Sequence, residues 1–382
     1  MKLWYIANAR MPSDRAHAIQ LAKMCEAFIK ESMLHVLLVP RREKNVSSPR
    51  TYYGLRYDLP LFRIPVLNLY GLGRPGFLLS SFVFALFTAW WLLKERLMGK
   101  NGIIYTIDMD QFSFLLVPML GLPYMVELHD AKPRSMRYRF LLKNACGIIT
   151  VNRDARTALV DTFGLDEKRI ITCPNGIDLA LFEGRPDMED ARRMHKLPLD
   201  QNIIVYMGRC YAWKGLDIVI DAARFFPERT MLVMVGMDEK ELLRLTGAST
   251  LPSYIRCVGV VPWRAIKSWY AAADAALVIG TQKNVYSYLH TSPMKLFEGM
   301  AAEVPLIAAS TPAIREIVSD KEVFFYEPDN PKSLGDAMRK VLEEKEARMR
   351  KVRRARKLVE VFTWDARAQR IKKFITHICG SV

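Results

Sequence analysis

The segment GRCYAWKG, residues 208–215, places Arg209 and Lys214 five positions apart between two glycines. A guanidinium offers a planar fork of donors to phosphate oxygens, and a lysine ammonium adds a mobile positive charge. The segment follows an apolar run and precedes a helical pattern that begins near Gly215, so it is expected at the carboxyl end of a parallel strand. Open α/β sheets bind ligands at this end, and the amino end of the following helix favours anions. Together these features suit a diphosphate. A surface loop with two solvated cations is the alternative, and the spacing differs from the phosphate-binding pattern GxxxxGK[ST].

A second group of polar residues lies in HTSPMKLFEGMAAEVPLIAAS, residues 290–310. Ser292 is expected as a helix N-cap and Pro293 as the first helical residue, which would direct the amino end of the helix and Lys295 at the same crevice. Glu298 follows Lys295 by three positions and therefore shares its helix face. A carboxylate there could accept hydrogen bonds from ligand hydroxyls, and an ordinary Lys–Glu helix pair is the alternative.

Short apolar runs alternate with stretches of helical length along most of the chain, which is typical of βα units around parallel sheets and predicts an α/β fold. We expect strands at 3–7, 35–39, 61–66, 102–106, 124–129, 147–151, 169–174, 202–208, 231–236, 254–259, 275–280 and 305–310. The clearest helices are expected at 16–31, 77–98, 134–144, 153–163, 215–226, 264–273, 292–302 and 330–345, with a basic helical stretch at 346–378.

The length of 382 residues exceeds one ordinary core and favours two domains. A polar segment near 181–200, which contains Pro and Gly, interrupts the alternation and is interpreted as the connection between them. We therefore expect one domain over residues 1–184 and a second over residues 185–363.

The net charge of +16 favours anionic partners, which include phosphate groups, nucleic acid and acidic membrane surfaces. Six cysteines are scattered without a CxxC pair, which suits reduced thiols and predicts no structural metal. The chain begins almost directly with a strand pattern and shows no signal peptide, so an intracellular protein is expected.

The apolar stretch 77–93, FLLSSFVFALFTAWWLL, is uncharged but contains three hydroxyl residues and is slightly short for a bilayer span. A buried or interface-lying helix is the preferred interpretation. The segment DMD at 108–110 resembles a metal-binding DxD motif, but its position between a strand and a helix-like stretch favours Asp110 as a helix N-cap.

Three segments in this order resemble signature segments of the retaining, nucleotide-sugar-dependent glycosyltransferases of family 4: GRCYAWKG, CPNGID (173–178) and SPMKLFEGMAAEVPLIAAS (292–310). The resemblance implies the GT-B fold, in which two Rossmann-like domains face each other across a cleft, with the acceptor on the first and the donor on the second. It implies that Arg209 and Lys214 bind the donor diphosphate and that Glu298 holds the ribose. The family's glutamate associated with the donor sugar falls on His290 here, which is a departure from the pattern.

In the first half, PYMVELHD (123–130) resembles the family strand that ends in a histidine facing the reacting sugar, so the resemblance implies His129 for that role. Asp130 could orient the imidazole, and a core or capping role for either residue is an equal alternative.

The loop after the first strand lacks the paired glycines of many family members and presents Arg10, Ser13 and Arg15, which are expected on the acceptor side. Trp364, in FTWDARA, matches the place where the last helix of this fold crosses back to the first domain. Residues 364–382 are therefore expected to join the first domain in space.

The resemblance implies transfer of a sugar from a nucleotide diphosphate sugar to a glycan, a lipid-linked sugar or a small molecule, with retention of configuration and with neither a metal nor another cofactor. The helix at 77–93 and the basic stretch 132–143 would suit peripheral docking on the inner, anionic face of the cell membrane. A core helix beside a solvated basic face is the alternative.

Two other functions fit part of the sequence. A nucleotide-sugar epimerase of the same fold would need no acceptor. A nucleic-acid-binding protein would explain the charge and the basic stretch near the C-terminus, but the sequence contains no known nucleic-acid module, so no nucleic-acid partner is expected.

Overall fold

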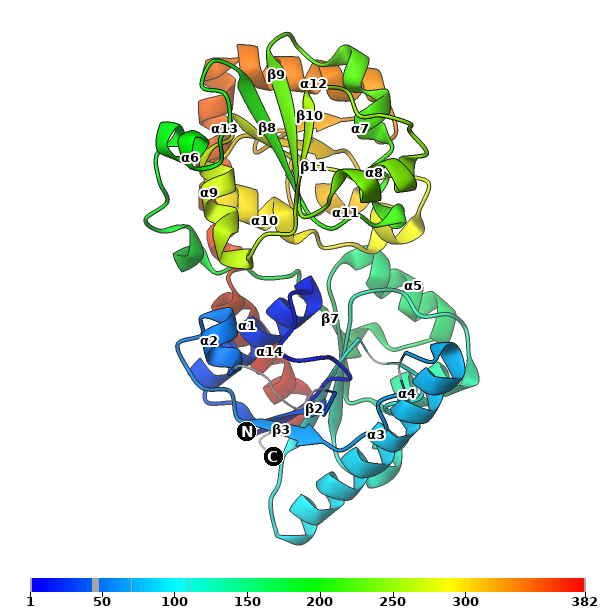
Figure 1. Cartoon of the computed structure of the whole chain (residues 1–382). Helices are drawn as coiled ribbons and strands as arrows, with labels where there is room; N and C mark the ends of the chain where they lie inside the picture. The colour runs from blue at the N-terminus through cyan, green and yellow to red at the C-terminus, as the bar shows by residue number, and fades with distance from the viewer. Residues whose placement is uncertain (1, 43–47, 70, 109, 381–382) are drawn as a thin grey trace. The chain divides into compact units, whose positions relative to one another are not determined.

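The computed structural model describes residues 2–42, 48–69, 71–108 and 110–380. It forms two compact units: unit 1 consists of Met1–Pro174 and Trp364–Val382, and unit 2 of Asn175–Thr363. Figure 1 shows a sheet flanked by helices in each unit.

The division between the units lies at Pro174/Asn175, whereas it was expected after residue 184. Two contacts within unit 2 explain the difference. The Asn175 backbone N–H donates to Ser292 Oγ at 3.0 Å, and Ile177 forms a parallel bridge with Thr363. The chain therefore joins unit 2 before the polar segment begins.

Unit 1 is built on a seven-stranded parallel sheet in the order β3-β2-β1-β4-β5-β6-β7. Its strands are β1 Leu3–Ile6, β2 Leu34–Pro40, β3 Leu61–Ile64, β4 Ile103–Ile107, β5 Tyr124–Leu128, β6 Gly147–Thr150 and β7 Ile170–Thr172. Its helices are α1 Ala16–Lys30, α2 Pro49–Tyr53, α3 Gly73–Leu97, α4 Met136–Asn144, α5 Arg153–Phe163 and α14 Trp364–Cys379, with 3-10 turns η1 Val117–Leu120 and η2 Glu167–Arg169.

Both faces of this sheet are covered, which explains why its strands read as continuous apolar runs. Successive side chains of a strand point to opposite faces. Trp4 of β1 contacts Trp91 of α3, with ring centroids 6.3 Å apart, while Tyr5 contacts Phe28 of α1 at 6.0 Å. Helix α14 packs beside α1, although more than 300 residues separate the two helices in sequence.

Unit 2 is built on a six-stranded parallel sheet in the order β10-β9-β8-β11-β12-β13. Its strands are β8 Asn202–Met207, β9 Thr230–Val235, β10 Ile255–Gly259, β11 Ala275–Val278, β12 Leu306–Ala309 and β13 Phe324–Tyr326. Its helices are α6 Met188–Met194, α7 Ile218–Asp221, α8 Glu239–Thr246, α9 Ile266–Ala271, α10 Met294–Ala301, α11 Pro312–Arg315, α12 Pro331–Glu343 and α13 Lys345–Val359. Short turns are η3 Leu179–Phe182, η4 Ala212–Lys214, η5 Ala223–Phe225, η6 Trp263–Ala265, η8 Glu360–Phe362 and the π-helical η7 Tyr286–His290.

Two local expectations were wrong, and one stretch that was correctly expected to be helical is divided. The helix expected at 215–226 is the four-residue α7 followed by a 3-10 turn. The basic stretch at 346–378 is two helices, α13 and α14, separated by η8. The polar segment near 181–200 contains α6 and belongs to unit 2, because the guanidinium of buried Arg192 bonds to Asp274 at 2.6 Å just before β11.

Candidate functional site

In each unit the strand order reverses between two neighbouring strands, and ligands of open α/β sheets bind at the carboxyl ends of such strands. In unit 2 these strands are β8 and β11, and Gly208 and Arg209 directly follow β8. In unit 1 they are β1 and β4, and His129 directly follows the adjacent β5. The sequence-predicted residues of both units thus lie at the edge of the sheet where a ligand is expected.

The ammonium groups of Lys214 and Lys295 both approach Gly208. A Cβ atom at Gly208 would lie 3.0 Å from Lys214 Nζ and 3.1 Å from Lys295 Nζ, and the backbone φ of +152° there also favours glycine. Lys214 Nζ donates to the Arg209 carbonyl at 2.8 Å, and Lys295 Nζ donates to Tyr206 Oη at 3.2 Å. The structure thus brings together two cations that are 81 residues apart in sequence.

Burial acts against the charge of both lysines. Desolvation, together with repulsion from Lys295, lowers the pKa of Lys214 well below its usual value. Desolvation also lowers the pKa of Lys295 to about 8, although Glu298 opposes the shift. Across the described part of the chain, neither ammonium forms a salt bridge. A bound anion would supply the stabilisation that both groups lack.

Aromatic rings surround the same cations. Lys214 Nζ lies 5.0 Å from the ring centroid of Tyr211 and 5.5 Å from that of Trp213, and Lys295 Nζ lies 4.6 Å from that of Tyr206. Such contacts partly replace water around an ammonium group. These three residues were not predicted from the sequence, because two of them lie within the loop and the third in a strand that looks like ordinary core.

Helix α10 begins differently from the expectation. It starts at Met294, and Ser292 does not cap it. Ser292 Oγ accepts the backbone N–H of Asn175, and Asn175 Nδ2 donates to the Ser292 carbonyl at 2.9 Å. The predicted N-cap was wrong because a long-range partner takes the serine hydroxyl, and that partner lies in the CPNGID segment.

Glu298 lies one turn into α10. Its Oε2 accepts the hydroxyl of Tyr270 at 3.2 Å. Burial raises the pKa of Glu298, although Lys295 and the Tyr270 hydroxyl oppose the shift. Among the described residues, only the Tyr270 hydroxyl donates to this acid, so Glu298 Oε1 can accept a further hydrogen bond. His290, predicted to stand in the place of the family's other acid, ends η7 and is 6% exposed.

In unit 1, His129 lies between two carboxylates. Its Nε2 is 2.6 Å from Glu127 Oε1, whereas its Nδ1 is 3.9 Å from Asp108 Oδ2, beyond hydrogen-bond distance. Burial alone would lower the pKa of His129, but Asp108 and Glu127 outweigh it and raise the pKa. Asp130 was predicted from the sequence as a residue that could orient this ring, whereas the structure places Glu127 and Asp108 against it.

Glu127 is itself held by the last helix of the chain. Arg367 of α14 donates to both of its carboxylate oxygens, at 2.8 and 3.2 Å, and the Tyr105 hydroxyl donates to Oε2. Both charged side chains are almost fully buried, at 1% and 2% exposure. Burial would raise the pKa of Glu127, but Arg367 and His129 hold it at about 2. The return of α14 to unit 1 therefore supplies the counter-charge for this buried acid.

The residues expected on the acceptor side lie at the start of α1. Arg10 and Arg15 are exposed, and Arg15 is the N-cap position of α1 without a side-chain cap. Ser13 has a structural role: its backbone N–H donates to Tyr53 Oη at 2.6 Å, and its Oγ accepts the backbone N–H of Arg15 at 3.3 Å.

The two acids of the DMD segment have different partners. Asp108 Oδ2 lies 3.1 Å from His17 Nδ1, while Asp110 Oδ1 accepts the backbone N–H groups of Phe112 and Ser113. Asp110 caps a series of turns and not the helix that was expected, and Met109 lies outside the described residues. Within the described ranges, no group of three or more His, Cys, Asp and Glu side chains could hold a metal ion.

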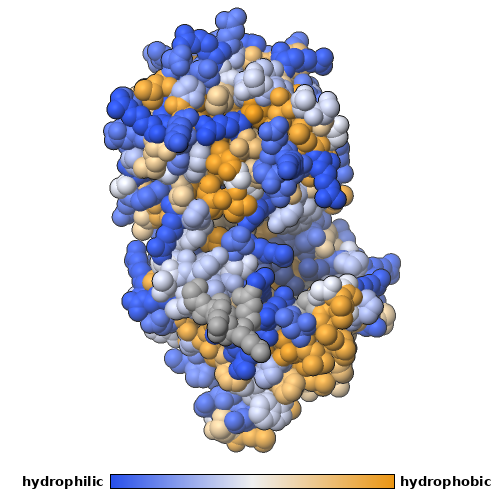
Figure 2. Space-filling model, in the orientation of Figure 1, coloured by the Kyte–Doolittle hydropathy of each residue, from blue (hydrophilic) through white to orange (hydrophobic). Residues whose placement is uncertain are grey.

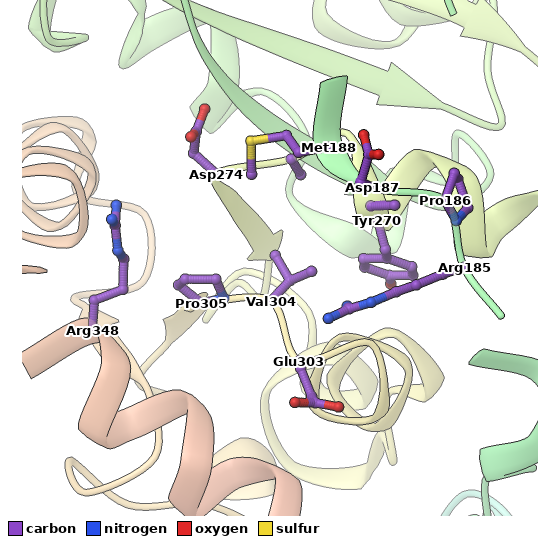
Figure 3. Close-up of a pocket in the computed structure, with 12 residues that line it drawn as sticks. Arg185, Pro186, Asp187, Met188, Tyr270, Asp274, Glu303, Val304, Pro305 and Arg348 are labelled. Atoms are coloured by element: carbon purple, nitrogen blue, oxygen red, sulfur yellow. The ribbon is translucent and has the colours of Figure 1, made fainter. Parts of the chain in front are cut away.

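A pocket of about 280 Å³ lies elsewhere in unit 2 (Figure 3). It includes Asp274 and Pro305, which precede β11 and β12, so it lies at the amino ends of these strands, opposite the edge that carries Arg209. Tyr270 lines this pocket, and its hydroxyl bonds to Glu298. We do not assign the ligand site to this pocket, since the predicted residues lie at the other edge.

Residues 187–358 match the family described as glycosyl transferases group 1. This region of the chain is therefore similar to the group 1 glycosyl transferases. This agrees with the resemblance found in the sequence, and the matched region covers most of unit 2, including the Gly208 loop and α10.

Curated proteins of similar sequence are also named as sugar-transferring enzymes. The chain is 26% identical over 234 residues to a D-inositol 3-phosphate glycosyltransferase of Xylanimonas cellulosilytica, covering 58% of this chain and 54% of that protein. It is 26% identical over 286 residues to a phosphatidyl-myo-inositol mannosyltransferase of Mycobacterium tuberculosis, covering 70% of this chain and 71% of that protein. The chain thus aligns with about half the length of the first of these relatives.

Solved structures show the same fold. Sucrose-phosphate synthase of Thermosynechococcus elongatus superposes with a TM-score of 0.76 at 17% identity and full coverage of both chains. The Anabaena protein HepE, solved with UDP-glucose, superposes with a TM-score of 0.72 at 18% identity, covering 99% of this chain and 100% of that one. The predicted GT-B fold is confirmed.

Proposed function

We propose that the chain transfers a sugar from a nucleotide diphosphate sugar to an acceptor, with retention of the anomeric configuration. The convergence of Lys214 and Lys295 at Gly208 carries this proposal. Both ammonium groups lose hydration and repel each other, so the site favours a ligand with at least two negative charges. The match of residues 187–358 to the group 1 glycosyl transferases supports a nucleotide diphosphate sugar as that ligand.

In the proposed reaction, Arg209, Lys214 and Lys295 donate to the diphosphate. Negative charge grows on the leaving diphosphate as its bond to the sugar breaks, and preorganised donors stabilise that charge without reorganising. Glu298 accepts a hydrogen bond from a ribose hydroxyl while Tyr270 orients the carboxylate. His290 replaces the family's other acid beside the donor sugar. The proposed mechanism requires neither a metal nor another cofactor.

His129 is proposed to contact the reacting sugar. Glu127 faces its Nε2, so Nδ1–H is the ring donor that can reach a sugar oxygen. The raised pKa favours the protonated ring, and a positive charge strengthens that hydrogen bond. Arg10 and Arg15, exposed at the start of α1, are proposed to contact the acceptor, with Ser13 shaping their loop.

We propose an acceptor that is lipid-linked and a location inside the cell, at the inner face of its membrane. The name of the mycobacterial relative, phosphatidyl-myo-inositol mannosyltransferase, describes a lipid acceptor for that protein. Nucleic acid is not a proposed partner. A free glycan or a small molecule as acceptor would leave the donor chemistry of this proposal unchanged.

Turnover with defined donors tests this function. We would incubate the whole chain with UDP-glucose or GDP-mannose and with vesicles that contain phosphatidylinositol, and follow the anomeric signals of donor and products by proton NMR. We expect products with the donor's anomeric configuration, and loss of turnover in Arg209→Ala, Lys214→Ala and Glu298→Ala. Lys240→Ala, an exposed lysine of α8, is the control.

Three results would count against the proposal. Products of inverted configuration would contradict retention. Formation of an epimer without any acceptor would favour an epimerase of the same fold. Undiminished turnover in all three site variants would show that the reaction takes place elsewhere.

A further inference from the structure

The outer face of α3 consists of large apolar side chains. Six of them follow one another at spacings of three and four residues, which place them on one helix face. Their side chains are 41–88% exposed: Leu79, Phe82, Leu86, Trp90, Leu93 and Leu97. Phe77 and Phe87 add to this surface. Figure 2 shows hydrophobic side chains gathered over the part of unit 1 that α3 occupies in Figure 1.

The inner face of the same helix contains several polar residues. Ser80, Ser81, Thr88 and Glu95 are all buried, beside the core residues Phe84 and Leu92. Ser80 Oγ accepts the backbone N–H of Leu69 at 3.1 Å, and Glu95 pairs with Lys100 at 2.7 Å. A surface helix of a protein in water normally has the opposite arrangement, with apolar residues inside and polar residues outside. The outer face of α3 is therefore suited to an apolar neighbour.

Helix α3 is long and apolar enough to cross a membrane by length and composition, with a mean hydropathy of 1.9 over its best 18-residue window. Packing argues against a crossing. In that window 44% of the residues are buried inside the protein, and Phe84 and Leu92 are 0% exposed in the core beside the sheet of unit 1. A helix with one side packed on its own sheet can present only the other side to lipid, as an interfacial helix does.

Basic residues accompany this apolar face. Lys94 lies near its C-terminal end, with Nζ 5.7 Å from the ring centroid of Trp90. Helix α4, which like α3 packs against η1, exposes a stripe with the spacing of one helix face: Met136, Arg139, Phe140 and Lys143. Met119 of η1 is 71% exposed. Apolar and basic side chains thus alternate over neighbouring elements.

We propose that the exposed face of α3, η1 and α4 docks this protein on a bilayer that contains anionic lipid. The helix α3 lies in the plane of the interface, with Leu86 and Trp90 inserted among the lipids, while Arg139 and Lys143 contact lipid phosphates. A second copy of the chain fits this surface less well, because a two-fold contact would bring the same basic groups of both copies together.

Docking would bring a lipid-linked acceptor to unit 1, and this consequence rests on the proposed function. The docking itself does not. Vesicle binding needs no donor, and nucleotide binding needs no vesicle, so the two claims can fail separately.

Vesicle flotation of the whole chain tests the proposal, with vesicles of phosphatidylcholine alone and of phosphatidylcholine with phosphatidylglycerol. We expect binding to the mixed vesicles that weakens with salt and is at least tenfold weaker on phosphatidylcholine alone. Leu86→Glu/Trp90→Glu should weaken binding at least tenfold, and Arg139→Ala/Lys143→Ala about fivefold for each charge removed. Met194→Glu/Leu199→Glu, a pair of exposed apolar residues in unit 2, is the matched control and should leave binding unchanged.

Two outcomes would overturn the proposal. One is an absence of vesicle binding by wild-type protein that melts cooperatively. The other is a concentration-dependent dimer in analytical ultracentrifugation that Leu86→Glu/Trp90→Glu disperses, because the surface would then join two copies of the chain. Circular dichroism and the melting temperature of each variant separate loss of docking from loss of folding.

Discussion

Lys295 gives a quantitative test of the donor site, because its charge depends on whether an anion is bound. Desolvation holds its pKa at about 8, compared with 10.5 in water. A diphosphate beside the ammonium would raise this pKa again. At pH 9, roughly nine-tenths of the free protein carries a neutral Lys295, so binding should be accompanied by the uptake of nearly one proton. Lys214, whose pKa is also lowered, can take up a second proton.

Isothermal titration calorimetry measures this uptake. We would titrate UDP at pH 9 in two buffers whose ionisation enthalpies differ, since the difference in binding enthalpy gives the number of protons taken up. Lys295→Met should lower that number by about one and weaken binding, whereas Lys240→Met should change neither. Binding of UDP by wild-type protein without proton uptake would refute the reasoning, and so would equal uptake by wild type and Lys295→Met.

The same substitution should stabilise the protein without ligand. A pKa of about 8 in place of 10.5 corresponds to roughly 3 kcal/mol. Because the side chain keeps some exposure and loses its bond to Tyr206, we expect Lys295→Met to gain about 1–2 kcal/mol in the free energy of unfolding at pH 7. The penalty is complete below pH 8 and disappears as pH rises through 10.5, since the folded state releases the proton first. Urea denaturation at pH 7 and pH 10 measures both values, and a loss of stability at pH 7 would contradict this account.

Three further substitutions test other parts of the structure. Glu127→Gln should cost about 3–5 kcal/mol in unfolding free energy by urea denaturation and lower the pKa of His129 in NMR titrations. In the wild type, the contribution of Glu127 to the free energy of unfolding should decline as pH falls from 4.5 to about 2, because its pKa is depressed. The same dependence of stability on pH in wild type and Glu127→Gln over this range would contradict this account. Gly208→Ala should raise the Kd for UDP at least about tenfold with a modest change in melting temperature, since its Cβ would meet the two ammonium groups. Ser292→Ala should cost about 1–3 kcal/mol by leaving the buried Asn175 N–H unpaired, and a cost near zero would show that another acceptor replaces it.

The sequence predicted the elements that position the donor site because those elements follow local rules. Apolar runs bounded by turn residues mark buried parallel strands, and the strand before Arg209 is of this kind. Position at a strand's carboxyl end then places Arg209 and His129 at a ligand-binding edge. The convergence of Lys214 with Lys295 was predicted only as a shared crevice, since their distances depend on how β8 and α10 pack.

The features of the site that were not predicted from the sequence depend on contacts between residues far apart in the chain. Ser292 has the type and position of an N-cap, yet its hydroxyl accepts from Asn175, which lies 117 residues away. Glu127 looks like a strand residue of ordinary polarity, and its partner Arg367 is 240 residues distant. No periodicity or spacing records such pairs.

Helix α3 shows a different limit. Its composition predicted a helix that is either buried or at an interface. The inner face is buried in unit 1, and the outer face is the one proposed to lie at an interface. The helix buries Ser80 and Thr88 and exposes Leu86 and Trp90. This arrangement could be recognised only from the position of the helix on the sheet. Helical periodicity alone does not show which face turns inward when both faces contain apolar residues.

The most direct test of the central claim is nucleotide diphosphate binding by the whole chain, measured by thermal shift with UDP, GDP, ADP and TDP, with and without EDTA. A ligand that binds only the folded state raises the melting temperature. We predict a shift with at least one of these nucleotides that persists in EDTA and that Lys214→Met/Lys295→Met abolishes, although this variant folds. No shift with any diphosphate, or an undiminished shift in the double variant, would contradict the assignment of the donor site to Gly208 and its two lysines.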